Sequence, residues 1–109
     1  MLTMLTQDPF DPSLKKIGPD GMQEKYLVLS DEERAKGFVR PYRDAYRHLA
    51  CGHITTMGRA LSETYARQPS FYGGTYCCHC KTHFPLLADG KRAFIWYEMD
   101  GSEKQGVGE

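Results

Sequence analysis

The stretch Tyr76-Cys-Cys-His-Cys-Lys-Thr-His-Phe84 carries the densest set of metal-binding side chains in the sequence. Three of the four cysteines and two of the four histidines lie within residues 77–83. The fourth cysteine stands upstream in Cys51-Gly-His53, together with a third histidine. Two clusters of thiolate and imidazole side chains joined by a short insert are typical of a tetrahedral zinc site. The sequence therefore predicts a small domain folded around one zinc ion.

The spacing of these residues suggests which side chains hold the ion. The pair Cys77-x-x-Cys80 can wrap an ion in one tight turn, and Cys51 supplies the third thiolate. The fourth ligand has two candidates. His53 would form a Cys-x-His pair, as in RING-type sites, whereas His83 would return to the ion through a Cys-x-x-Cys-x-x-His turn. Spacing alone favours His53 and leaves His83 open.

The number of protein ligands decides what such a site can do. Four ligands close the site, and closed zinc sites are structural. Three ligands, a bound water and a general base would instead make a zinc-dependent hydrolase, and the surplus histidine keeps this alternative open. Cys78 and His79 lie inside the Cys-x-x-Cys loop and are expected to point away from the ion. No catalytic residue is predicted.

Length and composition predict one small domain with a thin core. The chain has 109 residues, of which 40% are hydrophobic, and a metal ion commonly stabilises a domain of this size. The 14 basic and 14 acidic side chains cancel, so bulk attraction to nucleic acid or to an acidic membrane is not expected. We find neither a secretory-signal pattern nor an apolar run of membrane-spanning length. This predicts a cytoplasmic location, where cysteines bind metals rather than form disulfides.

The first part of the chain differs in composition from the rest. Residues 1–25 are rich in proline and glycine and poor in large apolar side chains. Such a segment cannot form a core, so we expect an extended or disordered arm, followed by a zinc-binding α+β domain at residues 26–109. Phe10 and Leu14 are the side chains with which the arm would contact a partner.

The remaining pattern predicts one main helix packed on a small antiparallel sheet. Thr55 or Thr56 would cap a helix that ends near residue 67, because Pro69 follows. Apolar side chains recur along one face of this helix, at Met57, Leu61 and Tyr65. A second, short helix would begin in the capping box of Ser30 and Glu33.

Strand and turn signals dominate the C-terminal part. Residues 92–99 alternate as a strand, with Phe94 and Trp96 on one face. Asp89-Gly90 predicts a hairpin turn, Asp100-Gly101 a second turn, and residues 105–109 a short final strand.

Residues 40–48 are the most basic stretch of the chain, with arginines interleaved with tyrosines, and residues 34–59 contain six basic side chains and one acidic one. Such a mixture suits a surface for phosphates and stacked bases, which makes a nucleic-acid-binding module one alternative. Its contacts would come from Arg40, Arg43, Arg47 and Arg59. The periodicity fits a helix or a strand; in the strand, Tyr46 and His48 share a face. A solvated charged face with inward tyrosines is the simpler interpretation.

Longer motifs suggest an origin for the chain. They are Cys51-Gly-His-Ile-Thr-Thr-Met57, Pro69-Ser-Phe-Tyr-Gly-Gly-Thr-Tyr-Cys77, Cys80-Lys-Thr-His-Phe84 and Phe94-Ile-Trp96. Over roughly residues 26–108, this CG-x-x-T…C-x-x-C-x-x-H-F pattern resembles small uncharacterised zinc-binding proteins of bacteriophages and prophages. The resemblance implies the ligand set Cys51, Cys77, Cys80 and His83, with His53 as the second choice. It implies no established activity.

The sequence thus predicts a small α+β, zinc-ribbon-like domain with a structural Zn²⁺ ion, an antiparallel sheet, one main helix and an N-terminal arm. Its expected function is that of a non-catalytic, phage-derived protein that binds a host protein or serves as a virion or assembly component. The expected location is the cytoplasm of a bacterial host or the virion, without a membrane partner. Nucleic-acid binding and zinc-dependent hydrolysis are the alternatives.

Overall fold

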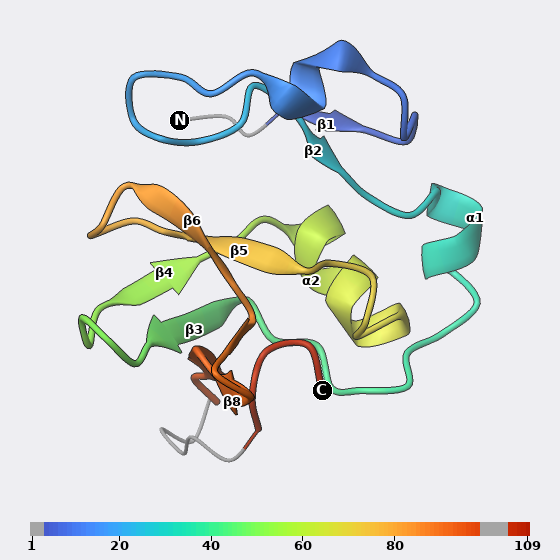
Figure 1. The fold of residues 1–109 in the computed structure, drawn as a ribbon. Helices are drawn as coiled ribbons and strands as arrows, with labels where there is room; N and C mark the ends of the chain where they lie inside the picture. Colours follow the sequence, from blue (N-terminus) through green and yellow to red (C-terminus); the bar gives the residue numbers. More distant parts are fainter. Residues whose placement is uncertain (1–3, 99–104) are drawn as a thin grey trace.

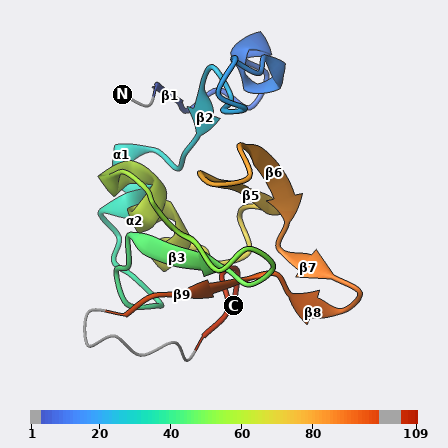
Figure 2. The same cartoon turned by 90° about the vertical axis from the view of Figure 1, so that its left-hand side faces the viewer.

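A three-stranded antiparallel sheet forms the centre of the computed structural model, which describes residues 4–98 and 105–109. The strands are β3 (Ala45–His48), β4 (Ile54–Thr56) and β9 (Phe94–Trp96), in the order β4-β3-β9; Figure 1 labels β4 and β3, and Figure 2 labels β3 and β9. Within it, Tyr46 pairs with Trp96 and His48 with Phe94. Residues 45–48 are therefore a strand, and the strand interpretation of the basic segment is confirmed.

Two hairpins follow in the second half of the chain. In the first, β5 (Gly74–Cys77) pairs with β6 (Thr82–Pro85); in the second, β7 (Leu87–Ala88) pairs with β8 (Lys91–Arg92). The turn between β7 and β8 is Asp89-Gly90, and both residues have positive φ, 53° and 76°. A type I′ turn requires this conformation, so the predicted hairpin turn is confirmed.

The C-terminal residues return to the central sheet. A single antiparallel bridge joins Ile95 to Gly106, and the N–H of Val107 donates to the carbonyl of Phe94. The predicted turn at residues 100–101 lies outside the described residues.

The main helix, α2 (Arg59–Arg67), begins later than predicted. Thr55 and Thr56, the expected capping residues, instead belong to β4, where Thr55 is buried and pairs with Tyr46. Gly58 occupies the N-cap position without a side-chain hydrogen bond. The prediction was wrong because threonine is β-branched and suits a strand equally well, and the pairing with β3 comes from outside the local sequence.

Aromatic side chains build the core between the central sheet and α2. Phe94 and Trp96 from β9 are almost fully buried. Tyr65 of α2 meets Trp96 edge-on at a centroid distance of 5.4 Å, and Tyr46 meets both β9 rings edge-on. Cys77 belongs to the same buried cluster, so one candidate ligand lies in the core itself.

The N-terminal segment (residues 4–25), expected as an extended or disordered arm, carries β1 (Leu5–Thr6) and a short 3₁₀ helix, η1 (Pro12–Lys15). β1 pairs in parallel with β2 (Tyr26–Leu27), and the segment lies at one end of the molecule above β5 and β6 (Figure 2). Internal hydrogen bonds close its loops, among them one of 2.8 Å from the N–H of Gly18 to the carbonyl of Met22. Its backbone is therefore folded onto itself.

The short helix α1 (Asp31–Arg34) links this end of the molecule to the sheet. The side chain of Ser30 accepts a hydrogen bond of 3.2 Å from the N–H of Glu33, which confirms the predicted N-cap. None of the helices in the described parts of the chain has the length and hydropathy needed to cross a membrane.

Candidate metal centre

The first of the two turns that carry the candidate ligands joins β3 to β4. His48 ends β3, and Cys51 follows three residues later inside the turn. The next residue, Gly52, has a φ of 77°, and its N–H donates a hydrogen bond of 2.7 Å to the carbonyl of His48. This bond curls the backbone so that a side chain at the strand end and one in the turn reach the same point.

The second turn, between β5 and β6, repeats this plan. Cys77 ends β5 and Cys80 follows three residues later. Lys81, with a φ of 57°, donates its N–H to the carbonyl of Cys77 at 2.8 Å. The N–H of Cys80 also points at the Sγ atom of Cys77, at 3.5 Å. Both turns therefore present two ligands three residues apart, followed by a residue with positive φ.

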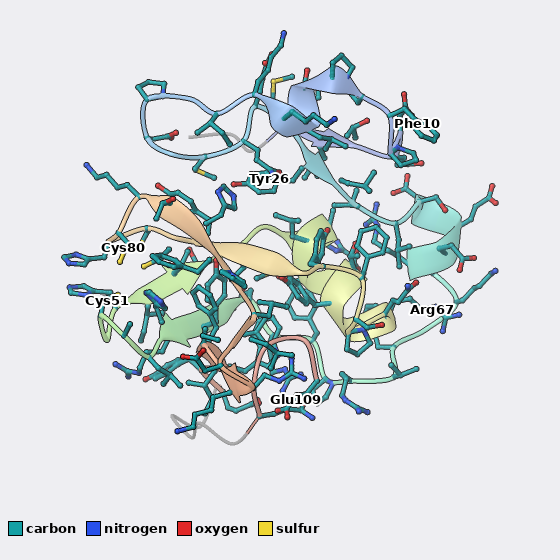
Figure 3. The ribbon with its side chains drawn as sticks, viewed as in Figure 1. Phe10, Tyr26, Cys51, Arg67, Cys80 and Glu109 are labelled. Carbon is teal, nitrogen blue, oxygen red and sulfur yellow. The ribbon has the colours of Figure 1, made fainter. Side chains whose placement is uncertain are left out.

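The two turns bring four ligand atoms together. The Nδ1 or Nε2 of His48 and the Sγ atoms of Cys51, Cys77 and Cys80 all lie within 4.8 Å of one another. The Sγ atoms of Cys51 and Cys77 are 3.5 Å apart, and the Sγ of Cys80 is 3.7 Å from Nδ1 of His48. Zn–S bonds of about 2.3 Å put tetrahedral ligand atoms about 3.8 Å apart. The four residues are therefore compatible with a metal site, at the edge of the molecule where Figure 3 labels Cys51 and Cys80.

One hydrogen bond ties the second turn to strand β4, which follows the first turn. The N–H of Cys78 donates to the side-chain oxygen of Thr55 at 3.0 Å, so the second turn is attached to β4. Because Thr55 is buried in the central sheet, this bond fixes the position of the second pair of ligands relative to the first.

Aromatic contacts hold the imidazole of His48 in place. Its ring packs on Phe84 and Phe94 at centroid distances of 4.5 and 4.7 Å, and the residue is 4% exposed. Burial lowers the pKa of His48 below its ordinary value. The imidazole is therefore neutral near pH 7, the form in which a ring nitrogen binds a metal ion.

The sulfur atoms influence each other's protonation. Burial raises the pKa of the Cys51 thiol, but hydrogen bonds from the His53 backbone and from the Cys77 and Cys80 thiols outweigh this and lower it overall. Burial, followed by the hydrogen bonds with Cys77 and Cys51, raises the pKa of Cys80 to about 11. Adjacent thiolates repel one another without a cation, whereas a bound divalent ion deprotonates a coordinating thiol.

The two histidines favoured by the sequence lie elsewhere. The Nε2 atom of His83 is 2.9 Å from the hydroxyl of Tyr26, and its ring packs on Tyr76. His53 is exposed and stacks on His79 with a centroid distance of 3.7 Å. The structure thus groups Cys51, Cys77 and Cys80 with His48, and neither His53 nor His83 belongs to this group. Cys78 and His79, which were expected to point away from the ion, are also not part of this group.

The sequence contained a signal for His48. His48-x-x-Cys51 has the same spacing as Cys77-x-x-Cys80, and the two pairs together read as a matched set of ligand turns. His53, on the other side of Cys51, offers a competing spacing. Only the strand assignment of residues 45–48 places His48 at a turn, and the local periodicity left that assignment ambiguous.

The arginines of the nucleic-acid alternative are spread over different surroundings. Arg43 is 8% exposed; its guanidinium lies 4.8 Å from the ring centroid of Trp96 and bonds to Glu98 at 3.0 Å. The other three make contacts nearer the surface: Arg40 with the carbonyl of Glu109, Arg47 with that of Gly52, and Arg59 with the carboxylate of Glu63. Arg43 therefore stabilises the fold from inside instead of facing solvent.

Comparison with protein-family models, with curated proteins and with solved structures gives no match.

Proposed function

We propose that this chain is a non-catalytic protein-binding module whose fold is held by a structural zinc ion bound to His48, Cys51, Cys77 and Cys80. The observation that carries the proposal is the convergence of these four ligand atoms within 4.8 Å. Three thiols and one imidazole form a soft donor set that suits zinc and does not suit magnesium or calcium. Two matched turns from two hairpins support a zinc-ribbon-like arrangement.

A structural role follows from the number and position of the ligands. Four protein ligands complete a tetrahedron and leave no position for a catalytic water, which speaks against the hydrolase alternative. The ligands also connect the central sheet to the β5–β6 hairpin, and Cys77 is part of the core. The ion would therefore supply folding free energy that a thin core lacks.

Exposed apolar side chains support a protein-binding role. Phe10 in the N-terminal segment is 88% exposed, and Ile17 in the same segment is 58% exposed. The nucleic-acid alternative is weakened by the internal position of Arg43 and by the balance of 14 basic and 14 acidic side chains. A phage origin, with a partner in the bacterial host or the virion, remains a prediction from the sequence resemblance.

The experiment that tests the zinc site measures zinc per chain in the purified protein and in single variants. We expect one zinc in the wild type and in His83→Ala and His53→Ala, and its loss in His48→Ala. Cys51→Ser, in the same turn as His48, should lose zinc as well. Retention of tight zinc by His48→Ala, with loss in His83→Ala, would restore the ligand set implied by the resemblance.

The protein-binding role needs a separate test. The zinc-loaded chain should recover a defined partner from host lysate or virions, and Phe10→Ala should weaken the recovery. Leu87→Ala is the matched control, because Leu87 is also exposed but lies in the β7–β8 hairpin. If neither source yields a partner under conditions where the chain is folded and holds zinc, the protein-binding role is contradicted.

A further inference from the structure

A cavity of about 90 Å³ lies where β4, β5, α2 and the N-terminal segment meet. Its walls are mainly aromatic, thioether and aliphatic side chains, among them Met22, Tyr26, Met57, Leu61, Tyr65 and Tyr72. The cavity is separate from the metal centre, since none of the four candidate ligands lines it.

The hydroxyl groups of four of the five lining tyrosines are already used by the protein. Tyr46 donates to the carbonyl of Tyr76, and Tyr76 in turn donates to that of Asp20. Tyr72 donates to the carbonyl of Leu27, and the hydroxyl of Tyr26 bonds to His83. Because these oxygens are satisfied, the walls offer chiefly carbon surface, which favours an apolar occupant.

Two strand edges border the same cavity. On β4, residue 53 is hydrogen-bonded to residue 48 and residue 57 to residue 44. Bonded and non-bonded pairs alternate along an antiparallel ladder, so Thr56, opposite Ala45, directs its backbone N–H and C=O away from β3. On β5, the N–H of Leu86 donates to the carbonyl of Gly73, so these two residues form a hydrogen-bonded pair. The next pair, Gly74 with Pro85, is therefore not hydrogen-bonded, and Gly74 directs its backbone N–H and C=O away from β6.

These outward groups are available for a partner. Within residues 4–98 and 105–109, the backbone N–H and C=O of Thr56 and of Gly74 have no hydrogen-bond partner. Both residues line the cavity. An apolar cavity bordered by free backbone donors and acceptors matches a peptide, in which an apolar side chain has a peptide group on either side.

We propose that this cavity binds one apolar side chain of a partner polypeptide, while the flanking peptide groups of that polypeptide bond to the backbone edges at Thr56 and Gly74. The proposal rests on the protein-binding role and names its site. The size agrees: the cavity is smaller than the roughly 150 Å³ cavity that encloses benzene, so it accepts a side chain of about leucine size that enters from outside.

The test uses the full-length, zinc-loaded chain and model compounds observed by NMR. N-acetyl-leucine N-methylamide should give saturable shifts at the signals of Met57, Leu61 and Thr56. N-acetyl-glycine N-methylamide, which has the same amides and no side chain, should give no saturable shift. 2-Methylpropane, which has the apolar surface of the leucine side chain and no amide, should bind more weakly than the leucine compound. Equal binding of 2-methylpropane, or no saturable shift with the leucine compound, overturns the proposal.

Two pairs of variants separate the cavity from the edge. Leu61→Phe should reduce affinity for the leucine compound about tenfold by filling the cavity, whereas Leu61→Met keeps the volume and should bind normally. Thr56→Pro removes the outward N–H without touching the ladder, since proline is tolerated on the free edge of a strand. It should weaken binding several-fold relative to Thr56→Ala, which removes only the side chain.

The outcomes distinguish this site from the general protein-binding role. If Thr56→Pro and Thr56→Ala bind the leucine compound equally well, the backbone edge is not used and the proposal is wrong. If a natural partner is recovered equally well by Leu61→Phe and by the wild type, protein binding stands but this cavity is not the site. Loss of the natural partner in Leu61→Phe, with normal recovery by Leu61→Met, supports the proposal.

Discussion

The two turns that carry the candidate metal ligands have the same backbone plan but different surroundings. In the first turn, His48 is buried and packs on two phenylalanine rings of the core, and Gly52 has open space around it. In the second turn, Cys77 is buried, but the carbonyl of Lys81 lies directly against Gly21 of the N-terminal segment.

The two turns are therefore held in position by different parts of the molecule. The first turn is positioned by the sheet beneath it, through the pairing of β3 with β9. The second turn is in contact with a segment that belongs to neither hairpin. We therefore expect the loss of a ligand in either turn to abolish zinc binding. Substitutions in the surroundings of the two turns should instead disturb different parts of the molecule.

The largest effect is expected from a substitution of Cys77, the candidate ligand that lies in the core. Cys77→Ser should abolish tight zinc binding and unfold the domain. Apparent zinc-binding free energies of about 10–16 kcal/mol are comparable with the whole net stability of a small domain, about 5–15 kcal/mol. Circular dichroism and zinc analysis are the measurements. Cys78→Ser is the matched control, because Cys78 is adjacent but exposed, and it should keep both zinc and fold. A folded, zinc-free Cys77→Ser protein would contradict a structural role for the ion.

A pair of glycine substitutions compares the surroundings of the two turns. Gly21 and Gly52 both have positive φ, 83° and 77°, so alanine is strained at either position. At Gly52 an added Cβ meets nothing within 4 Å, whereas at Gly21 it would lie 1.7 Å from the carbonyl oxygen of Lys81. We expect Gly52→Ala to cost about 1–2 kcal/mol from backbone strain alone, and Gly21→Ala to displace the N-terminal segment as well.

Limited digestion with trypsin measures that displacement. The N-terminal segment contains Lys15, Lys16 and Lys25, which should be cut faster in Gly21→Ala than in the wild type. Gly52→Ala should show the wild-type rate at these sites, with a lower melting temperature. Equal cleavage in both variants would mean that the segment does not depend on its contact with the second turn.

Local patterns predicted the parts of this fold that local chemistry decides. The Asp89-Gly90 turn needs only two residues that accept positive φ, and the Ser30 cap needs only a side-chain oxygen near the N–H of Glu33. The grouping of Cys51 with the Cys77-x-x-Cys80 turn also agrees with the spacing that suggested it.

The identity of the histidine depends on contacts between distant parts of the chain. His48 reaches the cysteines because β3 pairs with β9, which sets its ring against Phe94. Sequence spacing near Cys51 and Cys80 carries no information about that pairing. The start of α2 was predicted wrongly for the same reason, because Thr55 pairs with Tyr46 in a strand and the sequence near Thr55 does not show this. It also applies to the N-terminal segment, whose contact with Lys81 depends on a turn far along the chain.

The smallest effect is expected at Tyr26, and it distinguishes the two possible histidine ligands. Tyr26→Phe removes the 2.9 Å hydrogen bond to Nε2 of His83 while the ring remains, which should cost about 1 kcal/mol of stability. If His83 held the zinc, losing this partner would lower zinc affinity about 10–100-fold. With His48 as the ligand, zinc affinity measured by competition with a chelator should not change. Tyr72→Phe is the matched control, because it loses a comparable hydrogen bond to Leu27 without touching His83. Both variants should therefore melt at a slightly lower temperature and hold zinc as tightly as the wild type. A weaker zinc affinity in Tyr26→Phe alone would show that His83, in β6, is the fourth ligand.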